Sequence, residues 1–329
     1  MNQGIHKVKI LITGGGGFIG SHLTEYILSL GHEVVVLDDF SGASQANLNL
    51  AKESKKLSIM EGTILDRKLV SNLMADVSSC YHLAASLGVE RINLDPISSL
   101  EINLKGSEIV LNSAADAGVR TLLASSSEVY GKNTSMPLKE DSDRVLGSPQ
   151  VARWSYSEAK ALDELYAFEL YKNKSFPVSI ARFFNTVGPR QSGSYGMVLP
   201  RFVKAALSNQ PLIVYGDGSQ SRTFCAVSDV VEALDSLMSN SESVGQAYNV
   251  GATNEISIKD LAQKVIDVTG SKSQIDFKKH SEVFGDNFEE PARRVPDISK
   301  ISKAIGWQPK KSLESTILEV AGYTKANEV

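Results

Sequence analysis

Tyr156 and Lys160 are the residues of this chain whose types and spacing most directly suggest chemistry. In a helix, side chains at positions i and i+4 lie on the same face, so the phenol of Tyr156 would stand beside the ammonium of Lys160. A free tyrosine titrates near pH ~10, and a neighbouring positive charge favours its phenolate. We therefore expect Tyr156 to act as a base near neutral pH, although the same pair also occurs on exposed helix surfaces.

Ser126, Ser127 and Glu128 follow an apolar run at residues 121–125 that is typical of a buried strand. Polar side chains at the carboxyl end of a parallel strand can bind a ligand, because ligands of such sheets lie at that edge. A serine hydroxyl there could hydrogen-bond a substrate hydroxyl or carbonyl. Serine-rich strand ends are also ordinary turns.

Gly14, Gly17 and Gly20 lie between a short β-branched run and a helical pattern that begins at Phe18. A strand, a glycine turn and a helix N-terminus form a cradle for a pyrophosphate, because the first N–H groups of the helix can donate to it. Asp38 ends the next apolar run, and an acid about 20 residues beyond the glycines accepts hydrogen bonds from a dinucleotide ribose. The pattern predicts NAD rather than NADP, because the carboxylate would repel a 2′-phosphate.

These residues need a scaffold, and the alternation of strand and helix patterns indicates a parallel sheet covered on both faces. The predicted helices of the first half include residues 97–117 and 157–172. Its predicted strands are residues 8–12, 34–37, 57–60, 79–83, 121–125 and 178–182. After about Gly188, glycine-rich loops alternate with shorter elements, at residues 200–208, 212–215, 227–238 and 257–269. We expect an α/β fold, a doubly wound parallel sheet with a smaller interleaved C-terminal α/β domain.

The chain has 329 residues, a formal net charge of −4, and two cysteines, Cys80 and Cys225. This charge gives no sign of nucleic acid or a membrane surface as a partner, and the N-terminal residues lack the apolar run of a signal peptide. The cysteines and histidines show no metal-ligand spacing. We therefore expect a cytoplasmic protein without a metal site.

Taken together, these motifs resemble the extended short-chain dehydrogenase/reductase family, which comprises nucleotide-sugar epimerases, dehydratases and decarboxylases. The resemblance rests on residues 13–20, 38, 83–85, 125–131, 156, 160 and 182–185, and in the C-terminal part on residues 215–218, 222, 229, 248–251, 294–297 and 306–309. It implies a Rossmann-type NAD-binding domain formed by residues 1–185 and 223–255. It also implies a nucleotide-sugar-binding domain formed by residues 186–222 and 256–329.

The resemblance further implies a mechanism that begins with transient oxidation of the sugar at C4 by NAD. Tyr156 would take the hydroxyl proton, Ser126 would hydrogen-bond the same oxygen, and Lys160 would hold the nicotinamide ribose and lower the pKa of Tyr156. Besides Tyr156 and Lys160, the cofactor would contact Gly14, Gly17, Phe18, Ile19, Gly20, Asp38, Thr63, Ile64, Leu83, Ala84, Ala85 and Asn103. The substrate, a UDP-sugar in the leading interpretation, would contact Asn185, Arg190, Val198, Tyr215, Arg222 and Arg294. Thr63 stands where the family usually has Asp, so we expect altered adenine recognition.

After the first oxidation, family members catalyse epimerisation, decarboxylation or dehydration, and Ser127 and Glu128 bear on this choice. The run Ser126-Ser127-Glu128 resembles UDP-glucuronate decarboxylases and GDP-mannose 4,6-dehydratases, and the segment Arg153-Trp154-Ser155-Tyr156 also resembles the decarboxylases. Epimerases, however, are the commonest members. The leading interpretation is 4-epimerisation of a UDP-sugar. The alternatives are decarboxylation of UDP-glucuronate and 4,6-dehydration of a nucleotide hexose, and a non-catalytic NAD or nucleotide-sugar sensor is a candidate of a different class. The resemblance also implies a homodimer formed through the helices at 97–117 and 157–172.

Overall fold

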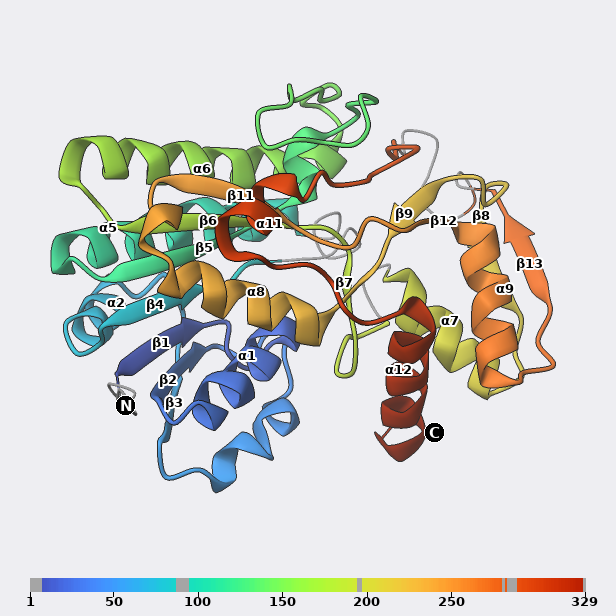
Figure 1. Ribbon diagram of the computed structural model, residues 1–329, viewed down its shortest axis with the longest axis horizontal. Coiled ribbons are helices and arrows are strands. Elements are labelled where there is room, and N and C mark those ends of the chain that lie inside the picture. Colours follow the sequence, from blue (N-terminus) through green and yellow to red (C-terminus); the bar gives the residue numbers. More distant parts are fainter. Residues whose placement is uncertain (1–7, 87–94, 194–196, 280–281, 283–288, 328–329) are drawn as a thin grey trace.

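The computed structural model describes residues 8–86, 95–193, 197–279, 282 and 289–327. Its central element is a seven-stranded sheet in the order β11-β6-β5-β4-β1-β2-β3, and every neighbouring pair is parallel (Figure 1). The strands are β1 (Lys9–Thr13), β2 (Glu33–Asp38), β3 (Leu57–Glu61), β4 (Ser79–His82), β5 (Arg120–Ser126), β6 (Val178–Phe183) and β11 (Gln246–Val250). This order places the carboxyl ends of β1 and β4, where the direction of winding reverses, at the centre of one edge.

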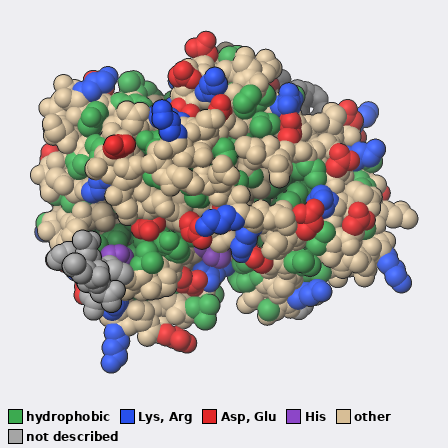
Figure 2. Space-filling model, in the orientation of Figure 1, with side chains coloured by type: hydrophobic (Ala, Val, Ile, Leu, Met, Phe, Trp, Pro, Cys, Tyr) green, Lys and Arg blue, Asp and Glu red, His purple; other side chains and the backbone are tan. Residues whose placement is uncertain are grey.

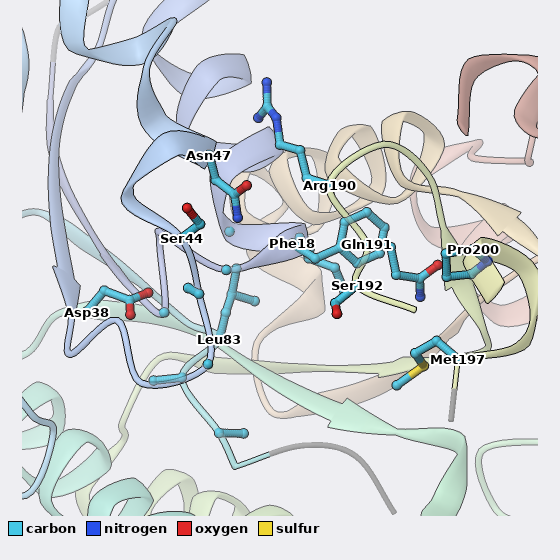
Figure 3. Close-up of a pocket in the computed structure, with 18 of the residues that line it drawn as sticks. Phe18, Asp38, Ser44, Asn47, Leu83, Arg190, Gln191, Ser192, Met197 and Pro200 are labelled. Carbon is cyan, nitrogen blue, oxygen red and sulfur yellow. The ribbon is translucent and has the colours of Figure 1, made fainter. Parts of the chain in front are cut away.

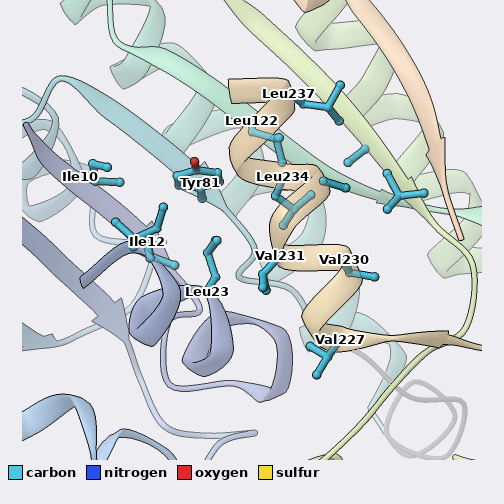
Figure 4. Close-up of a cluster of buried hydrophobic side chains, with 14 of the residues drawn as sticks. Ile10, Ile12, Leu23, Tyr81, Leu122, Val227, Val230, Val231, Leu234 and Leu237 are labelled. Carbon is cyan, nitrogen blue, oxygen red and sulfur yellow. The ribbon is translucent and has the colours of Figure 1, made fainter. Parts of the chain in front are cut away.

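Helices cover both faces of the sheet. One face packs against α1 (Phe18–Ser29), α8 (Val227–Ser239) and α11 (Ser299–Ile305). The other packs against α2 (Arg67–Met74), α5 (Ser107–Ala117) and α6 (Ser155–Lys174). Figure 4 shows how α8 directs Val231 and Leu234 toward Leu23 of α1 and Leu122 of β5. The apolar residues recur at helical spacing along α8, so a single stripe is buried.

A third hydrophobic cluster lies beyond the carboxyl edge of the sheet. It is formed mainly by α7 (Val198–Leu207), α9 (Ile258–Thr269) and α12 (Leu313–Asn327) with β8 (Leu212–Tyr215), which pairs in parallel with β13 (Ile275–Lys278). Short two-stranded pairs connect this part to the sheet: β9 (Ser221–Thr223) with β12 (Glu255–Ser257), and β7 (Thr186–Val187) with β10 (Cys225–Ala226). A separate core here supports the proposed second domain, whose bounds remain a prediction.

The predicted strands are all present, whereas the predicted helix at 97–117 is not uniform. It comprises α4 (Pro96–Leu100), a π-helical segment η3 (Glu101–Gly106) and α5. Asn103 lies in the π-helical segment with its side chain buried, where it accepts a hydrogen bond from the N–H of Ser86 and donates one to its carbonyl. A wider helical turn therefore coincides with a side chain tied to the loop after β4.

The remaining elements are short. Within the described ranges, five 3-10 turns join the larger elements: η1 (Gln45–Leu48), η2 (Ala51–Glu53), η4 (Ser127–Tyr130), η5 (Ala152–Trp154) and η7 (Ser241–Ser243). Among the described residues, no helix combines the length and apolarity needed to cross a membrane. On the face seen in Figure 2, acidic and basic side chains are interspersed.

Candidate active site

The glycine turn after β1 is too tightly packed for side chains at two of its positions. Gly14 has a φ of +71°, and a Cβ there would lie 2.7 Å from the backbone nitrogen of Ala84. A Cβ on Gly20 would lie 2.0 Å from the carbonyl oxygen of Gly14. These contacts bring α1 and the loop after β4 against the turn, so the N-terminus of α1 opens directly onto the edge of the sheet.

Asp38 braces the same turn from the end of β2. Its two carboxylate oxygens accept hydrogen bonds from the N–H of Gly16 at 2.9 Å and of Phe40 at 2.8 Å. Burial raises the pKa of this carboxyl above its usual value, while these backbone donors oppose the rise. The carboxylate is thus oriented by the protein and keeps further lone pairs for a ligand.

A cavity of about 1210 Å³ lies over this edge of the sheet, between Asp38 and Leu83 on one side and Met197 and Pro200 on the other (Figure 3). It is larger than the ~300–1,000 Å³ usual for one small ligand. Its lining includes most of the cofactor residues predicted from the sequence: Gly14, Gly17, Phe18, Ile19, Gly20, Asp38, Thr63, Ile64, Leu83, Ala84, Ala85, Tyr156 and Lys160. Asn103 lies apart from this lining and acts on the loop through Ser86.

These residues fit a bound NAD. The first N–H groups of α1 have no partner within the helix, and Phe18, Ile19 and Gly20 present them to the cavity. The N–H of Gly17, which precedes the helix, donates to the carbonyl of Gly14. Thr63 lines the expected adenine end, where its hydroxyl oxygen accepts a hydrogen bond from the N–H of Leu65. The pyrophosphate would face α1, and the ribose hydroxyls would face Asp38.

Tyr156 and Lys160 lie on α6 at the other end of the same cavity. Contrary to the expectation from the sequence, the protein groups hold the pKa of Tyr156 above its usual value. Burial is the largest cause, followed by the negative charges of Glu128 and Asp163, and only a hydrogen bond with Ser126 acts in the other direction. The Lys160 ammonium does not offset these effects, because it is buried and paired with Asp163 at 3.2 Å.

Glu128 sits between two arginines that reach it from distant parts of the chain. Arg153 donates to it at 3.0 Å and Arg294 at 2.8 Å. Although burial opposes ionisation, these two guanidinium groups hold the pKa of Glu128 well below its usual range. Ser126 accepts a hydrogen bond from the N–H of Glu128, and Ser127 beside it is buried. The polar run after β5 therefore places one ionised carboxylate, that of Glu128, between two guanidinium groups.

Two of the predicted substrate residues, Arg222 and Arg294, lie near each other, and three others, Asn185, Val198 and Tyr215, have separate surroundings. Arg222 and Arg294 are buried near each other, and Arg222 pairs with Glu290 at 2.7 Å. Asn185 donates to the carbonyl of Thr223, Val198 begins α7, and Tyr215 ends β8 beneath the guanidinium of Arg201, 4.3 Å from the ring centroid.

Arg190 differs from the others. Its segment lines the cavity, but its guanidinium turns away and binds Glu25 of α1 at 2.7 and 2.9 Å (Figure 3). The geometry therefore favours a structural ion pair over substrate binding for this residue.

The sequence interpretation did not assign roles to Arg153, Asp163, His82 or Glu290. The sequence did indicate a role in the site for Arg153, because this residue lies in the segment that resembles decarboxylases and precedes Tyr156 by less than one helical turn. His82 and Glu290 acquire their partners through contacts between separate segments of the chain. Asp163 instead lies three residues after Lys160 on the same helix, α6, so its spacing was already present in the sequence.

A doubly wound parallel sheet with a glycine cradle, an acid after the second strand and a Tyr–Lys pair facing one cavity defines a protein of the short-chain dehydrogenase/reductase class. A protein-family model described as GDP-mannose 4,6-dehydratase matches residues 11–320. The chain belongs to this family of extended short-chain enzymes, as its motifs predicted.

Individual relatives and solved structures indicate which members of the family this chain resembles. The chain is 38% identical to a UDP-N-acetyl-α-D-glucosaminuronate decarboxylase of Bacillus cytotoxicus, over 95% of this chain and 96% of the relative. It is 34% identical to UDP-glucuronic acid decarboxylase 1 of Arabidopsis thaliana, over 94% of this chain and 68% of the relative. Among solved structures, UDP-glucuronic acid 4-epimerase from Bacillus cereus, in complex with UDP-glucuronic acid and NAD, matches with a TM-score of 0.87 and 28% identity, over 97% of this chain and 99% of that chain. These findings confirm the fold class and the enzyme family, and they favour the decarboxylase alternative over the leading epimerase interpretation.

Proposed function

We propose that this enzyme decarboxylates a UDP-hexuronate with NAD as its cofactor. The observation that carries the proposal is the cluster of Arg153, Arg222 and Arg294 with Glu128 and Glu290. Three guanidinium groups against two carboxylates leave an excess of one positive charge. An anionic sugar and a diphosphate both suit such a site.

Two donor atoms of the cluster make the argument more specific. Within the described part of the chain, Arg153 Nε and Arg294 Nη2 are buried N–H groups without a hydrogen-bond partner. A buried donor left unsatisfied is costly, and a carboxylate accepts from several donors at once. The sugar carboxylate is the group that we assign to these donors.

The chain's own residues then have separable roles. Tyr156 accepts the proton of the C4 hydroxyl, and Ser126 hydrogen-bonds the same oxygen. Bound NAD supplies the acceptor for the hydride released from C4. A ketone at C4 makes loss of the C5 carboxylate feasible, because it can take up the electron pair left on C5. A proton then adds to C5, and the hydride and the proton return to C4 and its oxygen, so that the product differs from the substrate by carbon dioxide alone. Arg153 and Arg294 hold the carboxylate in place while Glu128, ionised, holds the two arginines.

The test is a product analysis. The enzyme is incubated with UDP-glucuronate, UDP-N-acetylglucosaminuronate and UDP-glucose, and the products are examined by mass spectrometry and NMR. We expect a product lighter by carbon dioxide from at least one uronate. An unchanged mass with a new configuration at C4 would show epimerisation instead, and a loss of water would show dehydration.

A matched pair of variants links the product to the arginine cluster. Arg153→Gln should weaken turnover of the uronate. Arg67→Gln should not, because Arg67 is exposed and pairs with the exposed side chain of Glu108 outside the cluster. Equal losses in the two variants would count against the assignment.

We also propose that the enzyme works in the cytoplasm as a homodimer. The mixed surface charge and the absence of cysteine pairs support the location: Cys80 and Cys225 are both free and buried. Exposed apolar side chains on α6, Leu162 and Leu165, support the dimer.

A further inference from the structure

We propose that Asp163 is a positioning residue for Lys160, and that a buried chain of hydrogen bonds through Ser107, His82 and Thr13 fixes it to the glycine turn. The proposal rests on the oxidation step of the proposed function and is independent of the decarboxylation that follows. None of these four residues was predicted to contact substrate or cofactor.

The chain of contacts is continuous across four elements. Lys160 Nζ lies 3.2 Å from Asp163 Oδ2, and Ser107 Oγ of α5 donates to the same oxygen at 3.0 Å. Ser107 Oγ lies 3.2 Å from His82 Nε2 at the end of β4. His82 Nδ1 in turn lies 2.7 Å from Thr13 Oγ1, the last residue of β1 before the glycines. All five side chains are buried.

The chemistry of the groups assigns each donor and acceptor. The ammonium can only donate to Asp163, and the Ser107 hydroxyl donates its one proton to the same carboxylate. The oxygen of Ser107 must then accept from His82, which places the imidazole proton on Nε2. His82 Nδ1 accepts from the hydroxyl of Thr13. Burial and the positive charge of Lys160 lower the pKa of His82 to about 3, so the ring is neutral as this scheme requires.

Glu164, the next residue, shows that the pairing of Asp163 with Lys160 is selective. Glu164 turns to the other side of α6 and is neutralised by Arg182, whose Nη2 and Nε lie 2.6 and 2.9 Å from its carboxylate oxygens. Among the ion pairs of the described residues, Asp163 has Lys160 as its cation. Glu164 therefore ties α6 to β6 through Arg182, and Asp163 holds Lys160, which lines the cavity.

The pairing of Asp163 with Lys160 affects the charge around Tyr156 as well as the position of Lys160. Tyr156 is faced by Glu128 from η4, by Asp163 from its own helix and by the hydroxyl of Ser126 from β5. Lys160 is faced by Asp163, with His82 of β4 and Ser107 of α5 behind it. Asp163 thus counters the charge that would otherwise favour the Tyr156 phenolate, and at the same time it holds the Lys160 ammonium in place. We therefore expect Lys160 to be held in a fixed position, with part of its positive charge offset by the carboxylate of Asp163.

Asp163→Asn tests this role, because it removes the charge and keeps the shape. Without the carboxylate, the pKa of Tyr156 should fall, so the limb of the pH profile of kcat/KM that reports the ionisation of Tyr156 should move to lower pH by about 1 unit or more. Asp163→Glu should restore this limb toward the wild-type position. Glu158→Gln, an exposed position on the same helix, is the control and should leave the profile unchanged. A slower Asp163→Asn enzyme in which the Tyr156 limb does not shift would show a merely structural role and overturn the proposal.

A second measurement needs neither substrate nor a variant of Asp163. The ¹⁵N shifts of His82, assigned by comparison with His82→Gln, should show a neutral ring protonated on Nε2 throughout the pH range in which the protein is folded. An Nδ1-protonated ring or an imidazolium would overturn the hydrogen-bond chain. This result is also separate from the proposed function, since a protein that decarboxylates no uronate can still show the predicted tautomer.

Discussion

The environment of Tyr156 shows how much of its reactivity depends on the bound complex. Glu128 and Asp163 both oppose its ionisation, and Lys160 is already paired. The protein alone therefore keeps the phenol protonated, and the positive charge of an oxidised nicotinamide is needed to favour the phenolate. We expect little base activity in this residue before the cofactor is in place.

Tyr156→Phe tests the proton transfer directly. The substitution keeps the ring and removes the acceptor, and positioned acid–base groups contribute about 10²–10⁴-fold. Turnover should fall by at least the lower end of this range while NAD binding, measured by calorimetry, is retained. Tyr166→Phe, at a partly exposed position on the same helix, is the control. Wild-type turnover in Tyr156→Phe would contradict the mechanism.

Asp38→Ser tests cofactor choice. The carboxylate should repel the 2′-phosphate of NADP, so the unmodified protein should bind NAD much more tightly, and the variant should lose most of that preference. Titrations of both cofactors against both proteins measure this. Because Asp38 also braces Gly16, thermal unfolding should accompany the titrations. Equal affinity of the unmodified protein for the two cofactors would contradict the assignment.

At the residue scale, the sequence predicted types of side chain better than their partners. Tyr156, Lys160 and Asp38 follow from local spacing alone. The ion pair between Glu128 and Arg294 spans 166 positions and forms only when the C-terminal segment returns to the sheet. No local pattern contains that contact. The fall in the pKa of Tyr156 expected from the neighbouring Lys160 is opposed first by burial and then by the charges of Glu128 and Asp163, and the burial becomes visible only in the fold.

At the scale of elements, β1 and α1 were predictable because a buried parallel strand and an amphipathic helix each have a distinct apolar pattern. The π-helical segment at Glu101–Gly106 was not, since its apolar residues suit an ordinary helix. Its wider turn accompanies the hydrogen bonds between Asn103 and the backbone of Ser86. Such a long-range contact leaves no trace in helical periodicity.

Gly20→Ala tests the packing of α1 on the glycine turn. The added Cβ would lie 2.0 Å from the carbonyl oxygen of Gly14, so the helix must shift, and overpacking of this kind costs about 1–3 kcal/mol or more. Both the melting temperature and NAD affinity should fall. Gly322→Ala in α12 is the matched control, because no atom lies within 4 Å of its Cβ. It should leave stability unchanged or raise it by up to ~1 kcal/mol. Similar losses in the two variants would refute this account of the turn.

At the scale of the whole molecule, α5 and α6 lie side by side on one face, joined by hydrogen bonds between Asn112 and Tyr166. Leu162 and Leu165 remain 50% and 56% exposed on this face. A two-fold dimer would cover them with the same face of a second copy. We expect a dimer mass by light scattering at micromolar concentration, and a monomer after Leu162→Glu combined with Leu165→Glu. A monomeric unmodified protein would exclude this arrangement.

The place of β11 in the sheet has a consequence for how the protein is made. β6 pairs with β5 on one side and with β11 on the other, but the two partners lie on opposite sides of β6 in the sequence. While a ribosome synthesises the chain, β6 must wait with one edge unpaired until Gln246–Val250 has emerged, and an open edge invites wrong pairing with other chains. Arrested nascent chains should therefore show protease protection of β6 only when they extend beyond Val250. Protection in shorter chains would mean that another segment shields this edge during synthesis.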